Sequence, residues 1–132
     1  MKTFFHAEQR LHHPRTYFSR GKMRAPQEVP ERATALLAAV HRLGFDVQAP
    51  IDHGVAPLRA VHSLAYLRFL ESAYRRWHAL DEDWGDEVIS NIFVRSPNAL
   101  RGILAEAARY LADGSAPVGQ HTWHSAYWSA QS

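Results

Sequence analysis

Residues 30–50, PERATALLAAVHRLGFDVQAP, decide the fold because they place a helix and a strand in direct succession. Apolar residues recur every three or four positions up to position 43, Pro30 suits a first helical turn, and Gly44 suits the residue after the last turn. Residues 45–49 are apolar and short enough for a strand, and a proline closes them. The sequence therefore predicts a helix over 30–43 that leads into a strand.

A second strand is predicted upstream, over residues 3–5, which are β-branched and aromatic. A polar stretch rich in His and Arg follows from 6 to 24, and we expect a long loop there. Two strands separated by a helix favour a parallel pair with a right-handed crossover, and thus an α/β fold. Because two strands leave both sheet edges open, we expect more chain or a partner to complete the sheet.

Three further helices are expected downstream. Ser63 is placed to cap a helix that runs to Trp77, an amphipathic helix is expected over 100–111, and Thr122 is placed to cap a last helix. A Gly- and Pro-marked loop precedes the first of these helices, and an extended loop is expected over 81–98. Four aromatic residues at helical spacing are expected in the core: Tyr66, Phe69, Tyr74 and Trp77.

Composition narrows the function classes. With 132 residues, 46% of them hydrophobic and 21% charged, the chain is expected to fold as one domain over 1–132. The formal charge is only +2 and no basic run is dense, so neither nucleic acid nor a membrane is an expected partner. Cysteine is absent, which leaves His, Asp and Glu as the strong metal ligands, and no signal peptide is recognisable, so we expect a cytoplasmic protein.

One motif carries a family resemblance. The segment VHSLAYLRFL over 61–70 is similar to the His-Ser-x-x-Tyr-hydrophobic-x-Phe-Leu signature of histone deacetylase-like proteins. Further matches to the acetylpolyamine branch are LHHPRT over 11–16, EVPER over 28–32 and the start of the last helix. The chain thus resembles the N-terminal part of an arginase-deacetylase family protein. The resemblance implies the N-terminal portion of a three-layer α/β/α parallel-sheet deacetylase fold, incomplete in this chain.

The resemblance also implies a chemistry, namely zinc-dependent hydrolysis of the acetamide of acetylated polyamines. The family's zinc ligands and its catalytic His pair lie beyond Ser132, and Asp52 next to His53 does not reproduce the family's Asp-x-His spacing. We therefore assign no catalytic and no metal residue, and expect this chain alone to bind no zinc and to be inactive. Two alternatives stay open, a fragment of a protein acetyl-lysine deacetylase and a non-catalytic interaction module.

For the N-terminal part of such an enzyme, the resemblance implies the tunnel rim and a homodimer contact. Glu106 and Asp113 are candidates to meet the cationic tail of the substrate, since a carboxylate attracts a protonated amine. A solvated helix residue and a helix-terminating Asp explain these two residues equally well.

Exposed aromatic residues are the other candidates. Tyr17 and Phe18, in the first loop, are candidates for the rim or the dimer contact. Together with Trp84 and Phe93 in the 81–98 loop they are expected to anchor the dimer. The His12/His13 and His121/His124 pairs are expected to be surface residues without a metal.

Overall fold

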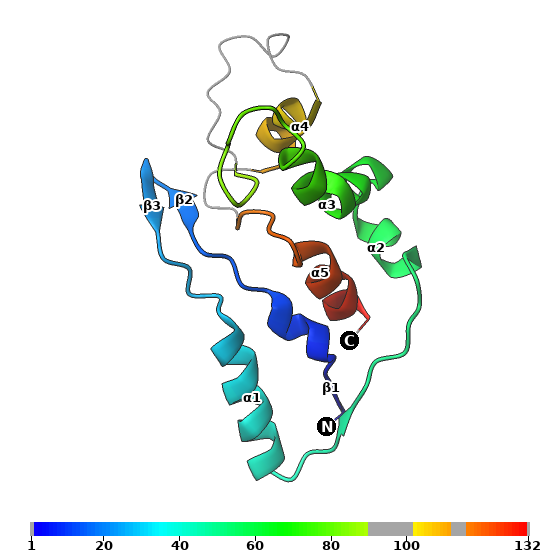
Figure 1. The fold of residues 1–132 in the computed structure, drawn as a ribbon. Coiled ribbons are helices and arrows are strands. Elements are labelled where there is room, and N and C mark those ends of the chain that lie inside the picture. Colours follow the sequence, from blue (N-terminus) through cyan, green and yellow to red (C-terminus); the bar gives the residue numbers. More distant parts are fainter. Residues whose placement is uncertain (1, 90–101, 112–115, 132) are drawn as a thin grey trace. The chain divides into compact units, whose positions relative to one another are not determined.

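The computed structural model describes residues 2–89, 102–111 and 116–131, without the side chain of Phe18 (Figure 1). The chain divides into two compact units. The first unit comprises Met1–His13, Glu28–Ser63 and His121–Ser132, and the second comprises Pro14–Gln27 and Leu64–Gln120.

A parallel pair of strands organises the first unit. β1 (Thr3–Phe4) pairs with β4 (Val47–Gln48), with Thr3 opposite Val47, and the Phe5 amide donates to the Gln48 carbonyl at 3.0 Å. α1 (Pro30–Arg42) lies between the two strands in the sequence. The predicted strand, helix, strand order and the parallel pairing are confirmed, and the chain is an α/β protein with shorter strands than expected.

The ends of α1 follow the sequence signals. Proline stands at the start of the helix, where its missing N–H takes no partner from the helix. At the other end Leu43 is the cap residue, and Gly44 has a φ of 72°, a left-handed conformation that suits glycine.

Shorter elements in the first unit were not expected. The 3-10 helix η1 (Ala7–Leu11) packs against α1 and against α5 (Thr122–Ala130), and α5 also contacts α2 (Ala56–Val61). The predictions of loops at these positions are wrong for η1 and α2. The prediction that Thr122 caps the last helix is also wrong, because His121 occupies the cap position and makes no side-chain cap hydrogen bond.

The second unit begins with a hairpin where a loop was expected. β2 (Tyr17–Ser19) pairs antiparallel with β3 (Lys22–Arg24). The turn between them holds Arg20 at φ 52° and Gly21 at φ 75°, the positive pair that a tight two-residue hairpin turn requires.

Two helices supply the core of the second unit. α3 (Leu64–Trp77) packs against α4 (Gly102–Tyr110), and a β-bridge joins Val88 to Val118. The core lies between these parts of the chain and contains Phe69, Ala73, Trp77, Val88, Ile103, Ala107, Leu111 and Val118, with Tyr66 packed against it. The core role predicted for the aromatic residues of α3 is confirmed for Phe69 and Trp77, whereas Tyr74 is half-buried and its ring meets that of His78 at a tilt of 50°.

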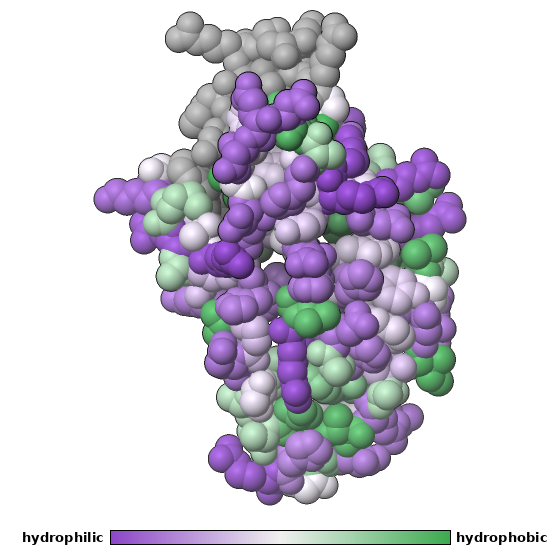
Figure 2. All heavy atoms as spheres, viewed as in Figure 1, coloured by the Kyte–Doolittle hydropathy of each residue, from purple (hydrophilic) through white to green (hydrophobic). Residues whose placement is uncertain are grey.

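The first unit has much less buried apolar surface. α1 contains no buried residue, and four aliphatic side chains of this unit are more than 60% exposed: Leu36, Leu43, Ile51 and Val61. Figure 2 shows hydrophobic residues, in green, at the surface of the molecule. None of the helices in the described part of the chain is both long and apolar enough to cross a bilayer.

Candidate functional site

The carboxyl ends of β1 and β4 define the first candidate site. Because the two strands are parallel, both chains leave the sheet at the same edge. In open α/β sheets ligands bind outside this edge. The residues that leave it are His6, which follows β1, and the 49–54 segment, which follows β4.

His6 is held in a fixed orientation at this edge. Its ring stacks on Trp128 of α5, with 3.7 Å between ring centroids and 8° between planes. Its Nδ1 accepts a hydrogen bond from the Glu8 amide at 3.3 Å, which in the neutral ring leaves the proton on Nε2. The side chain is therefore positioned by its own helix and by α5 together.

Asp52 is the charged group of this edge. Its Oδ1 accepts hydrogen bonds from the Tyr127 hydroxyl and from the Gly54 amide, the latter at 2.7 Å. The hydrogen bond from Tyr127 and then that from Gly54 lower the pKa of Asp52, and the same Asp52 contact raises the pKa of Tyr127. Asp52 is thus a carboxylate at neutral pH and Tyr127 keeps its proton.

Gln131 fixes the backbone beside Asp52. The residue is 7% exposed, its Nε2 donates to the Gly54 carbonyl at 2.9 Å, and its Oε1 accepts from the His53 amide at 2.9 Å. Both ends of a buried amide are therefore satisfied by the segment that follows β4. This clamp joins parts of the chain 78 positions apart.

These groups hold a carboxylate, an imidazole and a phenol at one sheet edge, but they do not form a metal site. No three His, Asp or Glu side chains converge as metal ligands within residues 2–89, 102–111 and 116–131. The residues present therefore do not fit the zinc that the family resemblance implies.

Glu106, the first predicted substrate-binding residue, lies in α4 and faces α3. Its carboxylate accepts two hydrogen bonds from Arg76, at 2.6 and 2.8 Å, and both side chains are 35% exposed. The contact lowers the pKa of Glu106 and raises that of Arg76. Glu106 is ionised, but an arginine already neutralises it. Asp113, the second predicted acidic residue, lies outside the described residues.

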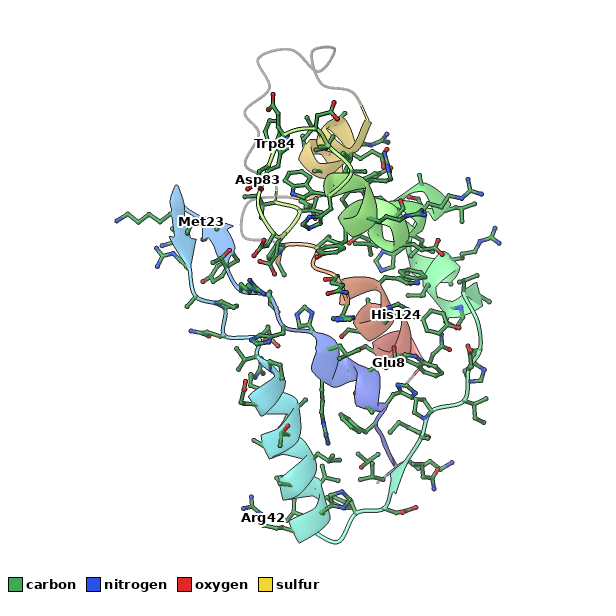
Figure 3. The ribbon with its side chains drawn as sticks, viewed as in Figure 1. Glu8, Met23, Arg42, Asp83, Trp84 and His124 are labelled. Atoms are coloured by element: carbon green, nitrogen blue, oxygen red, sulfur yellow. The ribbon has the colours of Figure 1, made fainter. Side chains whose placement is uncertain are left out.

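Tyr17 and Phe18 lie in β2, opposite Arg24 and Met23 of β3. The Tyr17 side chain is half-buried. The side chain of Met23 is 49% exposed and lies on the strand that returns from the hairpin turn (Figure 3).

The loop after α3 holds the other predicted anchor. Trp84, labelled in Figure 3, is 40% exposed. Its ring meets the buried Trp77 edge-on with 6.2 Å between centroids. Phe93 lies outside the described residues. Arg15, just before the hairpin, donates from its amide to the Glu87 carboxylate at 3.1 Å and from its side chain to Asp86 at 2.8 Å. These bonds join the start of the hairpin to the loop that follows α3 from residue 81, which we call the acidic loop.

The histidine pairs are peripheral. His13, His121 and His124 are exposed, and His12 is half-buried. His12 lines a groove of about 230 Å³ in the first unit, between η1, the start of α1 and α5, together with Gln9, Arg32, Leu36 and Ser129.

The fold and the edge residues place this chain among α/β proteins with a parallel sheet, the class that includes the arginase-deacetylase fold. No protein-family model matches the chain. It is 68% identical over 132 residues to an acetylpolyamine amidohydrolase of Burkholderia pseudomallei, which covers all of this chain and 39% of that protein. It is also 36% identical over 141 residues to acetylpolyamine amidohydrolase 1 of Pseudomonas aeruginosa, covering 99% of this chain and 39% of that protein.

Solved structures agree with this match. A crystal structure of the acetylpolyamine aminohydrolase from Burkholderia pseudomallei superposes with a TM-score of 0.91, covering 99% of this chain and 38% of that one. The chain matches the N-terminal part of an acetylpolyamine amidohydrolase, as the sequence motifs predicted, and it spans about 39% of the length of these relatives.

Sequence reasoning missed the residues that order the sheet edge. Asp52 followed two positions later by Gly54 is a local signal for a turn in which the carboxylate bonds the backbone. The stacking of His6 on Trp128 and the Gln131 clamp have no local signal, because their partners are more than 70 positions away.

Proposed function

We propose that this chain forms the N-terminal part of a zinc-dependent deacetylase that hydrolyses the acetamide of acetylated polyamines. The observation that carries the proposal is the 68% identity over the whole chain to a protein named for that activity. The intact protein is then a hydrolase, in which a zinc ion would supply an activated water and stabilise negative charge on the acetamide oxygen. The ligands of that zinc come from sequence that this chain does not contain.

The contribution of this chain is to the rim and to substrate positioning. A polyamine substrate carries protonated amines, so a carboxylate at the rim attracts the substrate and makes its binding more favourable. Glu106 is one candidate for this carboxylate. Its ion pair with Arg76 weakens its attraction for a second cation. Asp113 is the acidic alternative, and Tyr17 and Phe18 supply apolar rim surface.

A chimera tests the substrate class. This chain replaces the matching segment of the Burkholderia pseudomallei relative, and the folded chimera is assayed on an acetylated polyamine and on an acetyl-lysine peptide. Faster hydrolysis of the polyamine supports the proposal. A preference for the peptide points to a protein deacetylase, and a folded chimera inactive on both points to an interaction module.

The 132-residue chain alone is expected to bind no stoichiometric zinc. One tightly bound zinc per chain in metal analysis contradicts this expectation.

We further propose that the intact protein is a homodimer whose contact uses the hairpin region over 12–24 and the loop over 81–98. The exposed Met23 and Trp84 support this assignment, because long, flexible or aromatic apolar side chains at a surface favour an interface. Arg15 supports it too, since its bonds to Asp86 and Glu87 join the two segments into one surface.

A further inference from the structure

The apolar stripe of α1 is wider than the contact that covers it. Ala33, Leu37 and Val40 are half-buried and recur at the spacing of one helix face, and α1 packs on η1. Leu36 and Leu43 widen this stripe on one side, where they are 63% and 70% exposed. Leu36 also lines the groove beside η1 and α5. An apolar stripe that continues beyond the contact with η1 indicates a surface that another element covers.

The sheet and α2 of the same unit are uncovered as well. Parallel sheets are normally buried on both faces, yet β1 and β4 form a sheet of only two strands in the part of the chain that the structure describes. After β4, Ile51 is 73% exposed, and Val61 at the end of α2 is 76% exposed.

The comparison with relatives points to one occupant for these uncovered positions. The chain accounts for 39% of the Burkholderia pseudomallei relative, so 61% of that protein (100% minus 39%) has no counterpart here. We propose that Leu36 and Leu43 of α1, Ile51 after β4 and Val61 of α2 are docking positions for the C-terminal part of an acetylpolyamine amidohydrolase chain, and that this part binds even when it is a separate polypeptide. It extends the β1–β4 sheet and covers the four side chains. The inference rests on the same relationship as the proposed function, but not on zinc or on the substrate.

Co-expression tests the docking surface. The tagged 132-residue chain is expressed with the untagged C-terminal part of the Burkholderia pseudomallei relative, and the amount retained with the tag is measured. We expect the two to co-purify in equal amounts, and Leu36→Asp and Val61→Asp to reduce the retained partner at least about 10-fold, because each buries a charge at an apolar contact.

The chain offers matched controls for both variants. Ala38→Asp places the same charge in α1 about 200° around the helix axis from Leu36, and Ala60→Asp places it beside Val61 in α2. Both alanines are exposed, so both variants should retain the partner. Equal loss in Leu36→Asp and Ala38→Asp overturns the proposal, as does retention in all four variants. Self-association of the tagged chain in place of co-purification assigns the surface to a second copy and also overturns it.

A covalent version covers the case in which the C-terminal part does not fold alone. In the chimera, Leu36→Asp should lower the melting temperature by at least about 5 °C more than Ala38→Asp, whereas the two variants should match in the 132-residue chain. If Leu36→Asp lowers the melting temperature relative to Ala38→Asp by the same amount in the chimera and in the 132-residue chain, the proposal is contradicted. Co-purification without deacetylation of an acetylated polyamine leaves the docking surface standing and counts against the proposed function alone.

Discussion

At the scale of single residues, Gln131 is the side chain on which the sheet edge depends most. Both of its hydrogen bonds go to the backbone of His53 and Gly54. Gln131→Ala removes both of these part-buried hydrogen bonds, and each contributes about 0.5–1.5 kcal/mol to the free energy of unfolding. Urea unfolding measures this loss, and Ser129→Ala, at an exposed position of α5, should stay within about 0.5 kcal/mol of the parent. Equal losses in the two variants contradict a clamp role.

The Arg76–Glu106 pair predicts a pH dependence. The folded state lowers the pKa of Glu106 below its usual 4.5, so the pair stabilises the fold above that value and the stabilisation is lost as the pH falls through the lower, folded pKa. Arg76 stays charged throughout, because the same contact raises its pKa. Since both side chains are 35% exposed, solvent screening keeps the effect under about 1 kcal/mol.

Glu106→Gln isolates this effect. The variant should be less stable than the parent at about pH 6, and the difference should shrink toward about pH 3, because protonation of Glu106 at falling pH removes the ion pair. Asp52 also titrates in the acidic range, but it is present in both proteins and its contribution cancels. A difference in urea midpoint that is the same at both pH values rules out the ion pair as its cause.

At the scale of elements, the helices with a clear apolar period were predictable. α1, α3, α4 and α5 each contain at least nine residues, and their apolar residues recur every three or four positions. The missed elements are too short to show a period: α2 has six residues, η1 has five, and each hairpin strand has three. Their positions depend on tertiary contacts, such as η1 against α1 and α5.

The candidate site was less predictable than the fold for the same reason. Parallel pairing of β1 and β4 follows from the strand, helix, strand order, but the edge residues are ordered from α5 at the far end of the chain. The sequence offers Glu106 as a candidate carboxylate for a cation, and nothing in the pattern of α3 indicates that Arg76 binds it. Long-range partners of polar side chains are not encoded in local spacing.

Gly44 offers a test of how α1 ends. Its φ of 72° is unfavourable for any residue with a Cβ, and a Cβ added there meets no heavy atom within 4 Å. Gly44→Ala should therefore cost about 1 kcal/mol of unfolding free energy through the backbone alone. Gly44→Asn should cost less, because asparagine adopts this conformation more readily. Thermal unfolding compares them, and a Gly44→Ala protein as stable as the parent contradicts this account.

At the scale of the whole molecule, both anchors of the proposed dimer contact lie in the second unit. Its hairpin and acidic loop are tied through Arg15, and Trp84 presents part of its ring to solvent while the rest meets Trp77. A side chain that is anchored on one side and exposed on the other loses little entropy on association, which favours a role as an interface anchor. Tyr17, half-buried in β2, is the second anchor.

Removing both anchors in the chimera tests this contact. Tyr17→Ala with Trp84→Ala should shift the chimera toward monomer in sedimentation at micromolar concentration, because interface aromatics each contribute about 2 kcal/mol or more. Trp84→Phe keeps an aromatic ring next to Trp77 and should remain a dimer with an unchanged melting temperature, which separates lost association from lost folding. A folded double variant that sediments as the parent dimer places the contact elsewhere, because neither the hairpin nor the acidic loop would then carry the binding energy.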